Sequence, residues 1–280
     1  IQPASGDAGG SLGAALALWH IEDNNSRIVN QNDNMKGSYL GPEYDQSKIK
    51  KELNNIGANY EVMNEQDLIE KTALALSKGN AIGWFQGRME FGPRALGGRS
   101  ILADARSDKM QKNLNLKVKY RESFRPFAPS ILREDLVEWF DINVDSPYML
   151  LVANLNEKKS IKMDEEQEQL FGIDKLNIKR SNIPAVTHVD YSARIQTVDE
   201  KINKKYYDLI KSFKKITGCP VLVNTSFNVR GEPMVNTPTE AFECFMGTEL
   251  DVLVIENFFL EKSKQEQSLK KDYKEKFELD

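Results

Sequence analysis

The order of apolar and polar positions predicts a domain in which strands and helices alternate. Short apolar runs are typical of buried strands, and apolar positions spaced by three or four predict one face of a helix. Asn64 and Gly79 suit the two boundaries of one such helix, and residues 237–240 form a capping box with proline at the first helical position. The predicted strands are 81–85, 125–132, 148–152, 220–223 and 251–256, and residues 186–198 are predicted to be strand and turn. The predicted helices are 65–78, 107–117, 133–140, 199–217 and one that starts at 237.

Composition divides the chain into four parts. Residues 1–25 begin with a glycine-rich turn that runs into a helix of small residues. Residues 26–61 are polar and weakly patterned, which is typical of a linker or a long surface loop. Residues 62–260 form the main domain, for which irregular alternation predicts an α/β (α+β) fold around a mixed sheet. Residues 261–280 are predicted to be a charged helical tail on the surface.

Overall composition is that of a globular protein. Of 280 residues, 40% are hydrophobic and 29% charged, which excludes collagen-like and wholly disordered classes. No apolar run approaches the roughly 20 residues that cross a bilayer, so no membrane association is expected. Cys219 and Cys244 cannot make a disulfide framework, which favours the reducing cytoplasm. The start at Ile1, without a basic region, predicts a fragment of a longer protein.

Positive charge is concentrated in one segment. Between Arg88 and Arg133 there are 11 basic and 4 acidic residues, a local net charge of +7 within a chain of net charge −4. This distribution favours a localised anion site, and the acidic remainder argues against nucleic acid as a partner. The alternative is a cluster spread over a solvated surface.

The strongest motif is the segment 87–100, which reads GRMEFGPRALGGRS. Its glycines allow the backbone to approach a ligand closely, and its arginines offer planar forks for carboxylate or phosphate oxygens. The spacing matches neither a Walker A loop nor a dinucleotide fingerprint. The alternative is a tight turn whose arginines form outward salt bridges.

A second group of cations follows at Lys119, Arg121 and Arg125. In an extended segment their even spacing would place them on one face, where three cations repel one another unless an anion lies between them. The alternative is a solvated strand edge.

Polar residues also follow the predicted strand 220–223. Ser226 and Asn228 could complete an anion or nucleotide pocket at strand carboxyl ends, although this motif taken alone slightly favours a well-made polar turn. Arg194 is a further ligand candidate, whereas His188 is interpreted as structural. Two histidines and two distant cysteines provide no complete zinc site, and residues 154–183 are predicted to form a flexible, lid-like excursion.

Four stretches carry a family resemblance: GWFQGRMEFGPRALGGRSILADAR, KVKYRESFRPFAPSIL, PAVTHVDYSARIQTV and PVLVNTSFNVRGEPMVNTPTEA. Together they resemble the C-terminal half of the NodU/CmcH/TobZ family of O-carbamoyltransferases. The resemblance implies a YrdC-like domain around a twisted mixed β-sheet, preceded in residues 1–25 by the remnant of a domain of the actin-like ATPase class.

The resemblance also implies a reaction. Family members convert carbamoyl phosphate and ATP into carbamoyladenylate in the YrdC-like domain, then move the carbamoyl group onto a substrate hydroxyl in the actin-like domain. Arg94, Lys119 and Arg125 are implied as catalytic residues. The implied ligands of carbamoyl phosphate and the adenylate are Arg94, Lys119, Arg121, Arg125, Arg194, Ser226 and Asn228.

The resemblance further implies a divalent metal, iron or magnesium, in the longer protein. Asp7 would complete that site together with two histidines in a His-x-x-x-His arrangement, which this chain lacks. The chain alone is therefore expected to lack the transfer site. The hydroxyl-bearing small molecule stays undefined, and a homodimer is compatible with the sequence.

Two other functions remain open. One is a free-standing YrdC-like protein of tRNA threonylcarbamoyladenosine synthesis, and the other is a non-catalytic nucleotide-binding module.

Overall fold

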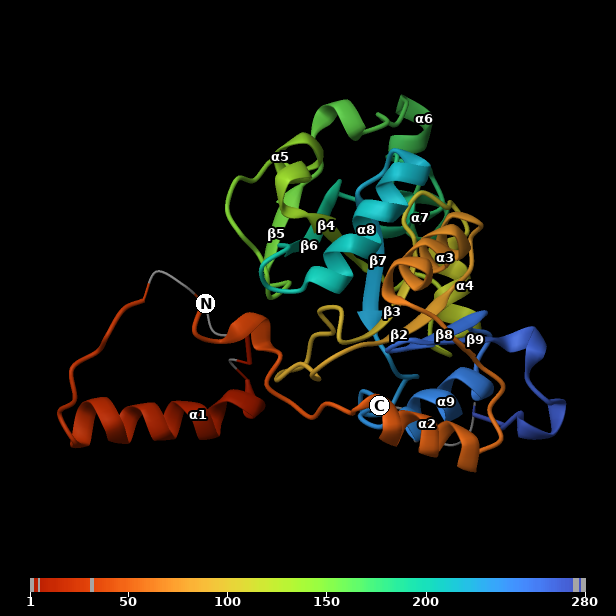
Figure 1. The fold of residues 1–280 in the computed structure, drawn as a ribbon. Helices are drawn as coiled ribbons and strands as arrows, with labels where there is room; N and C mark the ends of the chain where they lie inside the picture. Colours follow the sequence, from red (N-terminus) through yellow and green to blue (C-terminus); the bar gives the residue numbers. More distant parts are fainter. Residues whose placement is uncertain (1–2, 5, 31–32, 274–276, 278–280) are drawn as a thin grey trace.

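The computed structural model describes residues 3–4, 6–30, 33–273 and 277. The described residues form a nine-stranded mixed sheet with the order β1-β9-β8-β2-β3-β7-β4-β6-β5 (Figure 1). β2 and β8 run parallel, as do β4 and β6, and the other neighbours are antiparallel. The predicted α/β class around a mixed sheet is confirmed.

The element bounds are as follows. The strands are β1 Glu61–Val62, β2 Ile82–Phe85, β3 Arg99–Asp104, β4 Ala128–Leu132, β5 Leu151–Asn154, β6 Ser192–Val198, β7 Val221–Ser226, β8 Val252–Ile255 and β9 Phe258–Glu261. The α-helices are α1 Asp7–Ala17, α2 Gln46–Asn55, α3 Glu65–Ser77, α4 Met110–Lys117, α5 Leu136–Trp139, α6 Glu165–Glu168, α7 Gly172–Leu176, α8 Lys204–Thr217 and α9 Pro238–Gly247.

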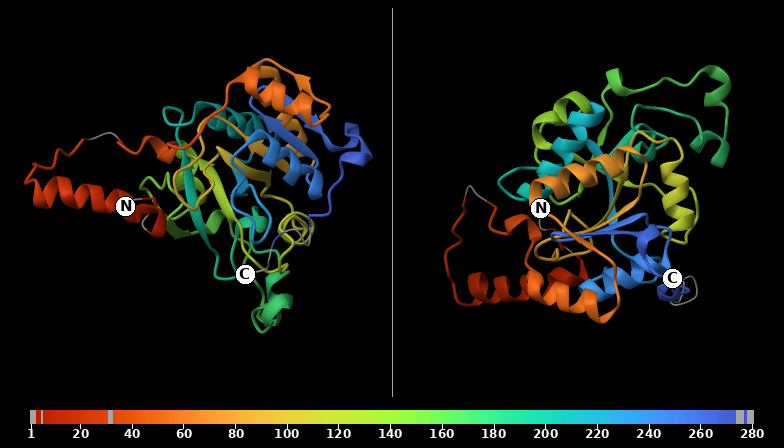
Figure 2. Two further views of the ribbon diagram at one scale, coloured as in Figure 1. Left: turned by 90° about the horizontal axis from the view of Figure 1, so that it is seen from below. Right: turned by 45° about the vertical axis from the view of Figure 1, so that its right-hand side comes forward.

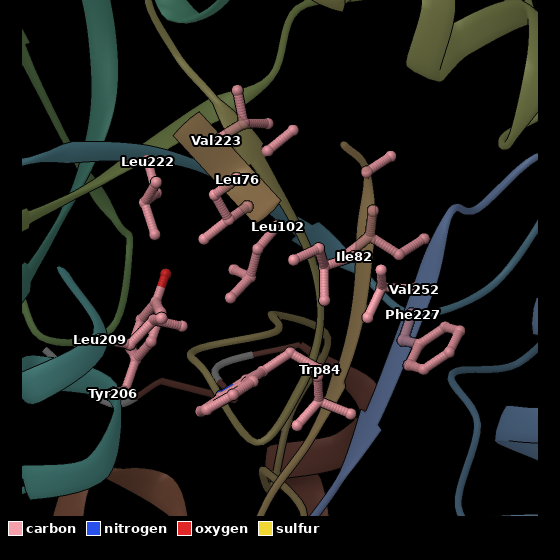
Figure 3. Packing of buried hydrophobic residues seen from close by; sticks show 14 of the residues in the cluster. Leu76, Ile82, Trp84, Leu102, Tyr206, Leu209, Leu222, Val223, Phe227 and Val252 are labelled. Carbon is pink, nitrogen blue, oxygen red and sulfur yellow. The ribbon is translucent and has the colours of Figure 1, made fainter. Parts of the chain in front are cut away.

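Helices cover both faces of the sheet. α3 and α8 pack against each other and against one face, and α9 with α2 covers the other (Figures 1 and 2). Trp84 of β2 and Tyr206 and Leu209 of α8 are fully buried in the core between this helix and the sheet (Figure 3). Trp84 Nε1 also donates a hydrogen bond to the Gly97 carbonyl at 3.0 Å, which fixes the glycine-rich loop on the core.

Capping signals predicted the helices well. Asn64 Oδ1 accepts a hydrogen bond from the Asp67 backbone N–H at the start of α3, and α9 begins with the complete capping box of Thr237 and Glu240. α8 ends at Thr217 and is capped by Gly218, whose φ of 75° lies in the left-handed region that favours glycine. These helix boundaries are confirmed to within a few residues.

Part of the polar segment 26–61 is not a linker. It contains α2, whose Ile49 and Leu53 are completely buried, and the short strand β1. Just before α2, the Ser38 carbonyl accepts a hydrogen bond from Phe91 N, and Gly41 N donates to the Met89 carbonyl. The apolar stripe of α2 is only two residues long, which explains why composition pointed to a loop. The wider domain division stays a prediction.

The two ends of the chain differ in how they pack. α1 and the π-helix Leu18–Glu22 extend away from the sheet (Figure 2), and Leu18, Trp19 and Ile21 are exposed. The predicted helical tail is wrong over 262–269, where the chain forms two 3₁₀ turns, and Tyr273 is buried beside Gly247. In the described part of the chain, no helix has both the length and the apolar character to span a bilayer.

The burial of α2 gives a stability prediction. Leu53→Ala should lower the free energy of unfolding by about 2–5 kcal/mol, because it leaves a cavity in the core. The exposed neighbour is the matched control: Lys51→Ala should change this free energy by less than about 0.5 kcal/mol. Urea unfolding measures both, and equal stabilities of the two variants would show that α2 does not belong to the core.

Candidate functional site at one end of the sheet

Strand order brings the chemistry-bearing loops to one end of the sheet. β3 and β4 both pair antiparallel with β7, so their first residues lie beside the end of β7. β6 runs parallel to β4 and therefore starts at this same end. The loops and strand ends that meet there carry the seven predicted ligands of carbamoyl phosphate and the adenylate.

A cavity of about 260 Å³ opens at this end. Five of the seven candidates line it, whereas Arg94 and Arg194 do not. The lining residues are Lys119, Arg121, Arg125, Ser226, Asn228, Val229, Arg230, Gly231, Glu232 and Pro233. We call it the cation cavity. Its four cations exceed its single lining carboxylate, Glu232, so it suits an anionic ligand.

Lys119 is the centre of this cavity. Its side chain is buried, with only 3% of the residue exposed. The three protons of the ammonium group are shared among four oxygens within hydrogen-bond distance: the Ser226 carbonyl (2.6 Å) and Oγ (3.2 Å), and the Asn228 carbonyl (2.9 Å) and Oδ1 (2.6 Å). Ser226 Oγ itself donates to Asn228 Oδ1 at 2.7 Å. The turn after β7 is therefore folded around the ammonium group.

Because Lys119 is buried, its charge depends on pH near neutrality. Desolvation, followed by repulsion from Arg121, lowers the pKa of Lys119 to about 7. The four surrounding oxygens favour the ammonium form, since a neutral amine has fewer protons to donate. Desolvation, followed by repulsion from Arg125, also lowers the pKa of Arg121 to about 10. An anion bound here would relieve both penalties.

The three cations of 119–125 converge by a turn and not by strand alternation. The expectation of an extended segment is wrong, because β4 begins only at Ala128. The buried Asn115 side chain holds the turn: its amide donates to the Ser123 and Arg125 carbonyls, and its Oδ1 accepts from Arg121 Nε at 2.7 Å. Tyr120, with φ of 49°, supplies the change of direction.

Two carboxylates that sequence reasoning missed organise the cavity. Glu122 forms ion pairs with Arg125 (2.9 Å) and Arg230 (3.2 Å). The buried Glu232 accepts from Val229 N at 2.8 Å and from the Tyr273 hydroxyl at 2.7 Å. The contacts of Glu122 with Arg125 and of Glu232 with Val229 are local, but no sequence pattern distinguishes them from ordinary turn contacts. The other partners, Arg230 and Tyr273, lie in distant segments.

A third carboxylate shapes the glycine-rich loop. Glu90 is buried, and its Oε1 accepts from the backbone N–H groups of Leu96 (2.6 Å), Gly98 (2.7 Å) and Arg99 (3.3 Å). Gly98 has no room for a side chain, since an added Cβ would lie 2.8 Å from the Arg88 carbonyl. The glycine-rich loop therefore folds around the Glu90 carboxylate.

The arginines of this loop have different environments. Arg99 is fully buried, donates to the Gln86, Gly87, Gly98 and Pro42 carbonyls, and stacks on Phe85. Arg88 is exposed and pairs with Glu43 at 3.3 Å. Arg94 has a buried Nε without a partner and no ion pair among the described residues. Arg94 is the one suited to a ligand.

Arg194 lies close to Arg94. Desolvation, followed by repulsion from Arg94, lowers the pKa of Arg194. The Arg194 Nε is also buried without a hydrogen-bond partner in the described chain. The loop that carries Arg94 is tied to β7, since Asn224 Nδ2 donates to the Ala95 carbonyl at 3.1 Å. The two arginines therefore form a second pair of cations at the same end of the sheet as the cation cavity.

The described residues do not form a metal site. No group of three or more His, Cys, Asp or Glu side chains is arranged to hold one within the described ranges. Asp7 begins α1, but its side chain lies outside what the structure describes. The described residues around the cation cavity therefore offer no ligand set for a divalent metal.

Comparison with known families identifies the family of this chain. Residues 73–262 match the family model "Carbamoyltransferase C-terminus". The chain belongs to this family. The match contains the glycine-rich loop, the turn around Lys119 and the turn after β7, so each of these parts of the site lies within it.

Several relatives match much or all of the chain. A protein of Synechocystis without an assigned function is 56% identical and covers 100% of this chain and 46% of the relative. Nodulation protein NolO of Bradyrhizobium diazoefficiens is 39% identical over 94% of the chain and 44% of the relative. The 3'-hydroxymethylcephem-O-carbamoyltransferase of Streptomyces clavuligerus is 36% identical over 65% of the chain and 30% of the relative. The chain spans less than half the length of these relatives.

Among solved structures, full-length HypF in its phosphate- and nucleotide-bound form gives a TM-score of 0.45 at 18% identity. The likeness covers 70% of this chain and 22% of HypF.

Lys119 gives a pH prediction for the cation cavity. Anion binding favours the ammonium form, so above about pH 7 each bound anion requires uptake of a proton. The affinity for sulfate, whose own charge is constant, should then fall between pH 7 and 9 by up to about tenfold per unit. Calorimetric titration measures this slope.

Two variants test whether Lys119 causes this pH dependence of the sulfate affinity. Lys119→Gln should bind sulfate more weakly and without the pH dependence, because the titrating group is gone. Lys117→Gln, at an exposed site on α4, should keep it. Equal sulfate affinity of the unaltered chain at pH 7 and pH 9 would contradict the role of Lys119.

Proposed function

We propose that this chain binds carbamoyl phosphate and ATP at the cation cavity and forms carbamoyladenylate. The observation that carries the proposal is the buried Lys119 ammonium group, held by Ser226 and Asn228 beside Arg121 and Arg125. Three cations in a half-enclosed cavity are suited to two anionic reactants. Family membership supports carbamoyl chemistry in particular.

The proposed reaction has two steps. Water cleaves carbamoyl phosphate to carbamate and phosphate. A carbamate oxygen then attacks the α-phosphorus of ATP, the bond from that phosphorus to the bridging oxygen breaks, and pyrophosphate leaves. Both reactants are anions, so Lys119, Arg121 and Arg125 would reduce their repulsion and stabilise the charge on the transferring group.

The remaining residues would orient the reactants. Ser226 and Asn228 hold Lys119 in the present state, and on binding they would direct hydrogen bonds to the neutral carbamoyl end. Arg94 and Arg194 have unpaired donors at the same end of the sheet, and they would bind further phosphate oxygens.

Transfer of the carbamoyl group to a substrate hydroxyl would use residues beyond this chain. Two observations support this part of the proposal: the relatives are more than twice as long, and α1 with the following π-helix exposes Leu18, Trp19 and Ile21. Residues 1–25 would then belong to the actin-like domain, where Asp7 would contribute to a site for iron or magnesium. The acceptor would be a hydroxyl-bearing small molecule.

Membership in the carbamoyltransferase family favours this function over a free-standing protein of tRNA modification. A non-catalytic nucleotide-binding module would share the cation cavity, so activity is the measurement that separates the two.

The test is pyrophosphate release that depends on carbamoyl phosphate. The chain, incubated with carbamoyl phosphate, ATP and magnesium, should release pyrophosphate above the level seen with ATP alone. Arg94→Ala should lower this rate by about a hundredfold, because it removes preorganised donors from the transferring phosphoryl group.

Arg88→Ala is the matched control from the same loop. It removes an exposed ion pair with Glu43, which contributes under about 1 kcal/mol, and should leave the rate unchanged. Absence of pyrophosphate from the unaltered chain would reject adenylate formation. A full rate in Arg94→Ala would remove Arg94 from the site.

A further inference from the structure

The chain that follows the last strand packs against α9 and reaches the cation cavity. Lys262 Nζ donates to two carbonyls at the C-terminal end of this helix, and Lys271 forms an ion pair with Glu243 of the same helix. Tyr273 comes next and is only 2% exposed. It lies beyond residues 73–262, which match the family model, so the family match does not account for its burial.

The ring of Tyr273 packs directly on Gly247, the last residue of α9. A Cβ added at Gly247 would lie 2.4 Å from two carbon atoms of that ring, so the close approach requires glycine here. The Gly247 carbonyl accepts a hydrogen bond from the Tyr120 hydroxyl at 2.7 Å. Since Tyr120 stands between Lys119 and Arg121 in the chain, the end of α9 contacts both Tyr273 and the turn around Lys119.

A continuous series of hydrogen bonds joins the Tyr273 hydroxyl to Lys119. The hydroxyl donates to Glu232 Oε1 at 2.7 Å, and Glu232 Oε2 accepts from Val229 N at 2.8 Å. The Glu232 carbonyl accepts from Asn228 Nδ2 at 2.6 Å. Asn228 Oδ1 in turn accepts from Lys119 Nζ at 2.6 Å. Every residue between the two ends of this series belongs to the turn after β7.

Glu232 also acts on Lys119 through its charge. Its carboxylate raises the pKa of Lys119, against desolvation and repulsion from Arg121, which lower it. The other titratable group that acts on Lys119 is Cys244 of α9. Burial, followed by the charge of Glu232, raises the pKa of the Cys244 thiol, so the thiol stays neutral. Arg121, with a pKa of about 10, stays charged. Near neutral pH, a change at Glu232 therefore reaches Lys119 directly.

We propose that Tyr273 is a positioning residue of the cation cavity: its hydroxyl holds the Glu232 carboxylate where the turn after β7 keeps its oxygens on the Lys119 ammonium group. This inference rests on the proposed function, because it requires an anion to bind at the cation cavity. It adds to the site a residue from the C-terminal segment. A Tyr273 that served folding alone would affect stability and leave the ammonium group unchanged.

The test is the pH dependence of sulfate affinity in Tyr273→Phe. Without the hydroxyl, the Glu232 carboxylate has one donor fewer, so it shifts or takes up a proton more readily, and the Lys119 ammonium group loses stabilisation. The pKa of Lys119 should then fall. Because sulfate binding favours the ammonium form, the affinity should begin to fall at a pH about half a unit or more below that of the unaltered chain. Calorimetric titration between pH 6 and 9 measures this shift.

Tyr207→Phe is the matched control. The Tyr207 hydroxyl also donates to a glutamate, Glu134, at 2.5 Å, and Tyr207 is likewise buried. Glu134 follows β4, whose first residues lie at the cation cavity, so this second pair is at the opposite end of the sheet. The variant loses the same kind of hydrogen bond, yet its pH profile of sulfate affinity should stay unchanged.

Glu232→Gln tests whether Tyr273 acts through Glu232. It removes the carboxylate charge directly and should shift the pH profile to lower pH at least as far as Tyr273→Phe does. Adding Tyr273→Phe to Glu232→Gln should then produce little further shift, because two residues that act through one contact are not additive. Thermal melting should show that each variant is folded.

The outcomes separate this proposal from the proposed function. An unshifted profile in Tyr273→Phe, a shift to higher pH, an equal shift in Tyr207→Phe or a full additional shift in the double variant would overturn the positioning role and leave the proposed function standing. A shifted profile without pyrophosphate release would support the positioning role and reject adenylate formation. If the unaltered chain binds no sulfate at any pH, the cation cavity is not an anion site, and both proposals fail.

Discussion

The structure of this site depends on the burial of one ammonium group. A lysine that leaves water must be surrounded by oxygen atoms, or its charge is lost. Lys119 finds four such oxygens on Ser226 and Asn228, more than a hundred residues later in the chain. This requirement fixes the turn after β7 against the turn after α4. Glu232 stabilises the turn after β7, because it accepts hydrogen bonds from Val229 N and from the Tyr273 hydroxyl.

The same end of the sheet holds cations that the protein does not neutralise. Arg94 and Arg194 each have a buried Nε without a partner among the described residues, and they lie close enough to repel each other. By contrast, the terminal nitrogens of Arg99 in the loop that carries Arg94 donate to four backbone carbonyls, and the exposed Arg88 pairs with Glu43. Unpaired buried donors reduce stability, so their concentration at one place indicates a binding function and not a structural one.

Local signals predicted the helices but not the shape of the site. Caps such as Asn64 and the glycine after α8 act within a few residues, so the sequence alone reveals them. The convergence of Lys119, Arg121 and Arg125 was expected from strand alternation, yet it arises from a turn held by the Asn115 side chain. Glu90 and Glu232 escaped notice because a carboxylate that accepts backbone N–H groups has no distinctive sequence pattern. α2 was missed because its buried stripe consists of Ile49 and Leu53 alone.

The central claim is that these loops form one anion site at this end of the sheet. The most direct measurement is a crystal structure of the chain soaked with pyrophosphate. We predict density for the anion within hydrogen-bond distance of Lys119 Nζ and of the Arg121 and Arg125 guanidinium groups, with the Lys119 ammonium still in contact with Asn228. Pyrophosphate bound elsewhere, with the cation cavity unchanged, would contradict the account.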